Sequence, residues 1–227
     1  MARPRLLDLF CGAGGAAMGY HRAGFDVTGV DIAPQPRYPF RFVQADAMTY
    51  PLEGYDAIHA SPPCQAFTAY RRRSASVGAD YPDLIADVRG HLLAAGKPWV
   101  MENVVRSPVR PHVCLCGSSF GLDVQRHRWF ETTFPALSPP CVHGVWKQRF
   151  PHATNRSNLR RTVEIGVWRI PLPVQQAAMG IDWMTLGELS QAIPPAYTEY
   201  IGGQLLREFP AREPAGRGTG GLGARNE

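Results

Sequence analysis

Short apolar runs alternate with helix-like segments over the first hundred residues of the chain. Residues 81–95 carry apolar side chains at the three- and four-residue spacing of a helix, and another helix is expected at 16–23, after a glycine turn. Five runs have the length of buried strands, at residues 6–10, 26–30, 40–44, 56–60 and 99–101. This alternation predicts an α/β domain.

The second half of the chain is less regular. Residues 105–135 predict short strands and turns, in which Arg126 and Arg128 are expected on one face of a strand and His127 on the other. Residues 135–170 have little periodicity, which favours a compact insert built from loops. Helices are predicted again in three places, at 171–180, at 185–193 and from 194 onward, before a tail of disordered composition that starts at 210.

A glycine-rich turn, residues 11–15, follows the first predicted strand. Glycines there let the backbone approach a ligand at the N-terminus of a helix. The next two strands end at Asp31, nineteen residues beyond Gly12, and at Asp46. Asp31 can accept hydrogen bonds from a ribose diol, and Asp46 from an adenine amine. The sequence therefore predicts an adenosine cofactor, and the missing G-x-x-x-x-G-K-[ST] pattern argues against a triphosphate.

A cysteine follows two prolines after the fourth predicted strand. Pro62 and Pro63 fix the backbone and remove two N–H donors, so neither a helix nor a central strand continues through Cys64. Ligands of open α/β sheets bind outside the carboxyl ends of strands, which makes a nucleophile plausible here. Taken alone, a Pro-Cys turn is weak evidence, and an inert buried thiol is the default interpretation until the rest of the chain is considered. Glu102 ends the next strand, where it either protonates a heterocycle or is a solvated loop acid.

Composition limits the class of protein. Hydrophobic residues make up 44% of the 227 residues and charged residues 19%, which are globular values. No apolar run reaches the roughly 18 residues of a membrane span, and residues 2–5 lead into a strand without a signal sequence, so a cytoplasmic protein without membrane association is expected. Five cysteines suit reduced thiols better than disulfides.

Basic residues cluster beside the Cys64 turn and in the later insert. The net charge is +5, and only Lys97 and Lys147 of the 24 basic residues are lysine. Genomic base composition can also produce this excess of arginine over lysine, so the positions of the basic residues are more informative than their number. Two clusters predict contacts to phosphate backbones, although a solvated basic face is the alternative. They are Arg71, Arg72 and Arg73, and then Lys147, Arg149, Arg156, Arg160 and Arg161.

Cysteines and histidines in the second half raise the question of a metal. A C-x-C pair, Cys114 and Cys116, precedes a C-x-H pair, Cys141 and His143, and the four could hold structural zinc. The spacing is atypical, and two buried thiols on strands are the simpler interpretation, so no metal ligand is predicted. His127 is interpreted as a strand histidine rather than a base.

In their order and spacing, four motifs resemble those of the DNA (cytosine-5) methyltransferase family, specifically its compact phage-type members. The resemblance covers about residues 5–208. The cofactor loop corresponds to 7–15, the nucleophile motif to 61–65, the ENV motif to 102–104 and the R-x-R motif to 126–128.

The resemblance implies a class I S-adenosylmethionine-dependent methyltransferase fold, Rossmann-like, with a mostly parallel sheet and a small loop-rich target-recognition insert. The implied cofactor is S-adenosylmethionine, the implied partner is double-stranded DNA, and a monomer is expected. The implied organisation is a catalytic and cofactor domain over 1–134, the insert over 135–170, helices completing the catalytic domain over 171–209 and a disordered tail over 210–227.

The resemblance also implies roles for single residues. The target cytosine is flipped into the pocket, Cys64 adds to its C6 atom, and the methyl group goes to C5. Glu102 would act on N3, the Pro62 carbonyl on the exocyclic amine, and Arg128, supported by Arg126, on O2. Cofactor contacts are expected from Phe10, Gly12, Ala13, Gly14, Gly15, Asp31, Ile32, Asp46, Ala47 and Pro62.

The chain departs from the family pattern in places. Ser61 replaces a usual glycine, Gln125 is out of register, and residues 190–193 replace a G-N-A-V element. Only thirty-six residues separate Phe134 from Pro171, which favours short or loose specificity, or a partner. Two alternatives stay open: a cytosine-5 methyltransferase acting on RNA such as tRNA, and a catalytically silent DNA-binding protein. The joint presence of the catalytic motifs argues against a silent scaffold.

Overall fold

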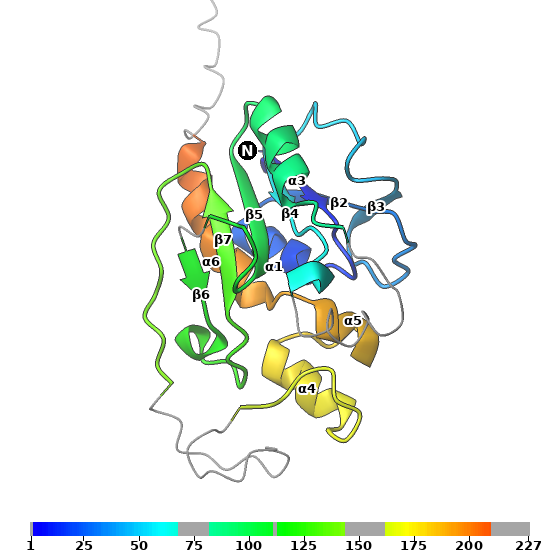
Figure 1. The fold of residues 1–227 in the computed structure, drawn as a ribbon, viewed down its shortest axis with the longest axis vertical. Helices are drawn as coiled ribbons and strands as arrows, with labels where there is room; N and C mark the ends of the chain where they lie inside the picture. The colour runs from blue at the N-terminus through cyan, green and yellow to red at the C-terminus, as the bar shows by residue number, and fades with distance from the viewer. Residues whose placement is uncertain (1, 68–81, 111–112, 144–161, 210–227) are drawn as a thin grey trace, which may run out of the picture.

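The computed structural model describes residues 2–67, 82–110, 113–143 and 162–209 (Figure 1). In these ranges one seven-stranded sheet has the order β3-β2-β1-β4-β5-β7-β6. Its strands are β1 (Arg5–Leu9), β2 (Asp26–Asp31), β3 (Arg41–Gln44), β4 (Ala57–Ala60), β5 (Trp99–Val104), β6 (Val113–Leu115) and β7 (Arg128–Thr132).

The first five strands pair in parallel, and β7 is antiparallel to both of its neighbours, β5 and β6. This arrangement confirms the mostly parallel, Rossmann-like sheet. β5 is longer than the sequence pattern predicted, because pairing with β7 carries it through Val104. Glu102 therefore lies inside a strand, opposite Phe130, and not beyond its end.

Helices cover both faces of the sheet. Helices α1 (Gly15–Ala23) and α6 (Pro195–Leu205) cover one face, and α3 (Ile85–Ala94) covers the other. The structure also describes α4 (Leu172–Met179), α5 (Leu186–Gln191) and the short 3-10 helices η1 (Gln65–Phe67), η3 (Gly117–Phe120) and η4 (Leu206–Glu208). Leu6 belongs to the core under α1 and α6, and Leu7 to the core under α3. Successive side chains of a strand point to opposite faces, so β1 contributes to both cores.

Helices α1 and α6 approach each other closely. Gly19 of α1 makes this approach feasible, because a Cβ atom there would lie 2.1 Å from the Pro195 carbonyl oxygen. Thr198 Oγ1 donates a hydrogen bond of 2.8 Å to the Ala16 carbonyl across the same contact. The N-terminal part of the sheet domain is therefore completed by a helix from the far end of the described chain.

Helices α4 and α5 form a separate lobe beside the glycine turn. Figure 1 shows them together at the lower end of the molecule, away from α3. Their core includes Met179 and Leu189, and it also takes in Val163 and Ile170 from the end of the predicted insert. Trp183 Nε1 donates to the Ala13 carbonyl at 2.8 Å, which fixes this lobe to the glycine turn. Across the described ranges, no helix combines the length and the apolar character needed to cross a membrane.

Candidate active site

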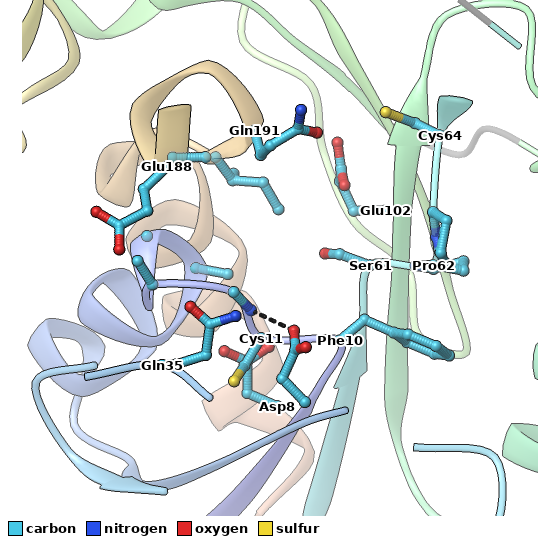
Figure 2. A pocket seen from close by; sticks show the side chains of 18 of the residues that line it. Asp8, Phe10, Cys11, Gln35, Ser61, Pro62, Cys64, Glu102, Glu188 and Gln191 are labelled. Carbon is cyan, nitrogen blue, oxygen red and sulfur yellow. Dashed lines mark hydrogen bonds between the residues drawn. The ribbon is translucent and has the colours of Figure 1, made fainter. Parts of the chain in front are cut away.

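A cavity of about 440 Å³ lies beyond the carboxyl ends of β1, β2 and β4, where the glycine turn meets α5. Figure 2 shows Cys64, Glu102 and Pro62 on one side of it, and Asp8, Gln35 and Glu188 on the other. Ten of the predicted site residues line the cavity: Phe10, Gly12, Ala13, Gly15, Asp31, Ile32, Pro62, Cys64, Glu102 and Arg128. The structure thus brings most of the predicted cofactor and catalytic residues together in one place.

Other predicted site residues do not line this cavity. Asp46 is exposed, and its Oδ1 atom accepts from the Met48 N–H at 2.9 Å, while Ala47 is buried in the core under α3. Gly14 caps the N-terminus of α1, and Arg126 lies behind the cavity wall. The predicted DNA contacts lie outside the described residues: Arg71, Arg72, Arg73, Lys147, Arg149, Arg156, Arg160 and Arg161.

Positive backbone angles shape the glycine turn. After β1 the chain turns at Phe10, with φ of 58°, and at Gly12, with φ of 48°. A left-handed conformation costs a non-glycine residue about 1–2 kcal/mol, so Phe10 is held there by its surroundings. The turn is fixed to β2 because Gly12 N–H donates to Asp31 Oδ2 at 3.0 Å and Ala33 N–H donates to Oδ1 at 2.9 Å. Each carboxylate oxygen keeps a second lone pair for a ligand.

Asp8 is a cavity residue that the sequence reading missed. Its side chain is fully buried and lines the cavity. Tyr38 O–H donates to Oδ2 at 3.4 Å, but Oδ1 has no hydrogen-bond partner among the described residues. Burial raises the pKa of Asp8 to about 8, which the Tyr38 hydrogen bond only partly offsets. The available signal was a single acid inside the apolar run of β1, where a charge is costly unless a ligand meets it.

The Cys64 turn is held from β5. Asn103 is buried, and its Nδ2 donates to the Pro62 carbonyl at 2.8 Å. Cys64 follows at the start of η1, half-buried and facing the cavity. The Pro62 carbonyl therefore already has one donor, and any substrate amine would have to use its second lone pair.

Glu102 and Arg128 form a buried ion pair beside this turn. Arg128 Nε lies 3.0 Å from Glu102 Oε1. Burial raises the pKa of Glu102, against the opposing effect of Arg128 and Arg126. Burial and the Glu102 charge likewise raise the pKa of the Cys64 thiol, while the two arginines lower it. Burial thus favours the protonated forms of Cys64 and Glu102, whereas the two arginines favour their ionised forms.

The prediction that Arg126 and Arg128 share one strand face is wrong. β7 begins only at Arg128, and Arg126 has a positive φ of 35°, which turns it out of the strand. Its guanidinium donates to the Ser190 carbonyl at 2.6 Å and the Ala192 carbonyl at 3.0 Å, at the end of α5. Burial and the like charge of Arg128 lower the pKa of Arg126 to about 9, so it remains cationic at neutral pH.

A buried histidine links α1 to the site. Tyr20 Oη lies 3.0 Å from His59 Nδ1, and His59 Nε2 lies 2.7 Å from Ser61 Oγ. Ser61 in turn hydrogen-bonds Glu102. Burial lowers the pKa of His59 to about 3, so the ring is neutral and can donate from only one nitrogen. The sequence predicted only a strand here, because Tyr20, Ser61 and Glu102 come from separate parts of the chain.

Two methyltransferases are similar in sequence to part of this chain. No family model matches the chain. It is 29% identical over 118 residues to Type II methyltransferase M.HgiDI of Herpetosiphon aurantiacus, and 31% identical over 126 residues to Type II methyltransferase M1.HphI of Haemophilus parahaemolyticus. These matches cover 45% and 44% of this chain but 38% and 32% of those proteins, so the chain spans about a third of their length.

Solved structures share the fold over most of the chain. A mutant form of Spodoptera frugiperda DNMT2 superposes with a TM-score of 0.60 at 14% identity, covering 89% of this chain and 99% of that one. A putative DNA modification methyltransferase encoded within an E. coli prophage gives 0.56 at 16% identity, covering 90% and 99%. The fold is therefore that of the class I S-adenosylmethionine-dependent methyltransferases.

Proposed function

We propose that this chain methylates cytosine at C5 in double-stranded DNA. Its motifs, its methyltransferase relatives and its fold support membership of the DNA (cytosine-5) methyltransferase family. The observation that carries the proposal is the cavity in which Cys64, Glu102 and Arg128 meet the glycine turn. This cavity is bordered by a thiol nucleophile, a buried acid and a cofactor loop. Such a combination is suited to the transfer of a methyl group to a heterocycle.

The cavity residues fit S-adenosylmethionine, the cofactor that this fold and the methyltransferase relatives support. When bound, it supplies an electrophilic methyl group. Asp31 would bind the ribose diol through its free lone pairs, and Phe10 would stack on the adenine. Asp8 Oδ1, buried and without a partner in the described part of the chain, would meet the cationic end of the cofactor. Asp46 and Ala47, expected at the adenine, would have to contact it from outside this cavity.

Cys64 would begin the reaction as a thiolate, forming a bond from Sγ to C6 of the flipped cytosine. Glu102 would hold a proton at N3, which its raised pKa favours, so that C5 becomes the nucleophile. Arg128 would keep Glu102 in place and contact O2, and Arg126 would fix the wall behind it. Loss of the C5 proton after methyl transfer then breaks the Sγ–C6 bond and frees Cys64.

Double-stranded DNA is proposed as the substrate because basic residues cluster in the sequence shortly after Cys64 and again in the insert. RNA is the alternative, because thirty-six residues are few for a recognition domain. The two substrates are separated by experiment.

The test is base-resolution methylcytosine sequencing of both DNA and RNA from cells that express the wild type, Cys64→Ala or Cys114→Ala. We expect methylcytosine in DNA at a defined sequence context with the wild type and Cys114→Ala, and none with Cys64→Ala. Methylation in RNA alone would replace the proposed substrate. Equal methylation by Cys64→Ala would overturn the mechanism.

A further inference from the structure

Two cysteines and two histidines converge outside the cavity. Cys116 follows β6 and precedes η3, His127 directly precedes β7, and Cys141 and His143 lie in the segment that follows β7. One ligand atom from each residue lies within 4.8 Å of the other three. We infer that Cys116, His127, Cys141 and His143 bind one structural zinc ion.

The distances match a tetrahedral site. Cys116 Sγ lies 3.2 Å from His143 Nε2, and Cys141 Sγ lies 3.5 Å from His127 Nε2. With Zn–S bonds of about 2.3 Å and Zn–N bonds of about 2.0 Å, a tetrahedron separates sulfur from nitrogen by roughly 3.5 Å. The two imidazole rings lie at 88° to each other, so both Nε2 atoms approach one point from different directions.

Serine hydrogen bonds hold the ligands in place without an ion. Ser119 Oγ donates to the Pro140 carbonyl at 2.9 Å, and Ser118 Oγ accepts from the Val142 N–H at 3.2 Å. Ser138 Oγ accepts from the Cys114 N–H at 2.9 Å. The segment that carries Cys141 and His143 is therefore fastened to β6 and η3 on both sides of the site. Such preorganisation is typical of a binding site and lowers the cost of ordering its ligands.

The donor set favours zinc over other metals and over a disulfide. Two thiolates and two imidazoles, with no oxygen ligand, are the donors of closed structural zinc sites. A disulfide between Cys116 and Cys141 would leave unexplained why one histidine nitrogen faces each sulfur. Cys114, which the sequence pattern included, is not part of the group, and His127 takes its place.

The site adjoins the catalytic residues through the backbone of His127. Arg128 Nη1 donates to the His127 carbonyl at 3.0 Å, and Arg128 Nε faces Glu102. On the other side, His143 leads into the part of the insert that carries predicted DNA contacts. Zinc would thus fix the start of the insert to the strand that bears Arg128. This role in methylation rests on the proposed function, whereas the metal site itself is independent of it.

Metal content of the purified full-length chain tests the inference independently of methylation. Plasma mass spectrometry should find one zinc per wild-type chain, and cobalt in its place should give intense visible bands typical of tetrahedral thiolate coordination. Cys141→Ser and His143→Ala change exposed positions and should bring zinc close to background with an unchanged circular dichroism spectrum. Cys114→Ser, two residues from a ligand, should keep its zinc.

Three results would overturn the inference. The first is wild-type protein without zinc whose cobalt spectrum lacks those bands. The second is an intact mass that shows a Cys116–Cys141 disulfide in protein purified under reducing conditions. The third is equal zinc content in Cys141→Ser and the wild type. If zinc is present but DNA is not methylated, the metal site stands and the proposed function alone fails.

Discussion

Charges around Cys64 set how readily its thiol ionises. Glu102 raises the pKa of Cys64 and Arg128 lowers it. We expect Glu102→Gln to lower the pKa of Cys64, because it removes a nearby negative charge, and Arg128→Gln to raise it, because it removes a nearby positive charge. The pH dependence of iodoacetamide alkylation at Cys64, followed by peptide mass spectrometry, measures both shifts. Identical profiles for the wild type and both variants would show that these charges do not control the thiol.

His59 makes stability sensitive to acid. Its pKa is lowered to about 3 in the folded protein, against 6.5 as its ordinary value. Between these values the unfolded chain binds a proton that the folded chain does not, so stability falls as pH drops below about 6.5, by up to 1.4 kcal/mol per unit. Asp8 has a raised pKa, so its contribution to stability grows as the pH falls from about 8 to 4. A comparison of the wild type with a His59 variant cancels this contribution, because both proteins contain Asp8.

We therefore expect His59→Gln to flatten the acid side of the stability curve relative to the wild type. Urea unfolding at pH 5 and pH 7 measures the free energies of unfolding. The same drop in both proteins would argue that His59 is protonated in the folded state.

Spacing in the sequence was enough to predict the positions of residues that follow directly on their own strands, such as Cys64 and Asp31, which both line the cavity. It did not suffice where distant elements decide the environment. Arg126 leaves the strand pattern because its guanidinium donates to backbone carbonyls 64 and 66 residues later in the chain. Asp8 gave a local signal, an acid in an apolar run, but only the fold shows that it borders a cavity.

At the scale of elements, the contact between α1 and α6 depends on one missing side chain. Gly19→Ala would force its Cβ against the Pro195 carbonyl and the Thr198 hydroxyl, both 2.1 Å away. We expect a loss of about 2–4 kcal/mol in the free energy of unfolding, because backbone must move. Denaturant titration monitored by circular dichroism measures the loss.

Gly203→Ala, in the same α6 helix, is the matched control. Among the described residues, no atom outside the local helix backbone lies within 4 Å of a Cβ built there, so alanine should stabilise the protein by about 0.5–1 kcal/mol through helix propensity. If both variants had the same effect, helix propensity and not close packing would govern this contact.

The order of elements was largely predictable from the sequence, since apolar runs and helical spacing identified β1 to β5, α1, α3 and the C-terminal helices. The antiparallel insertion of β7 between β5 and β6 was not, because three- and five-residue strands with few distinguishing side chains are placed by long-range pairing. The same pairing carries β5 past Glu102 and brings His127 toward Cys141.

For the molecule as a whole, cofactor binding should appear as added stability. A ligand at a hundred times its Kd adds about 2.7 kcal/mol, or roughly 5–10 °C in Tm for a chain of this size. We expect S-adenosylhomocysteine to raise the Tm of the wild type and of Cys64→Ala alike, and to have little effect on Asp31→Ala. Thermal denaturation across ligand concentrations makes the measurement. A wild type without any shift would contradict the assigned cofactor site.

The packing of α6 on α1 also has a consequence for how the protein is made. About 170 residues separate the end of α1 from the start of α6 along the chain. At synthesis rates of roughly 5–20 residues per second, the ribosome delivers α6 about ten to forty seconds after α1. Through that interval Tyr20 and its apolar neighbours have no cover from α6, so the nascent chain exposes an aggregation-prone apolar surface until α6 has been synthesised.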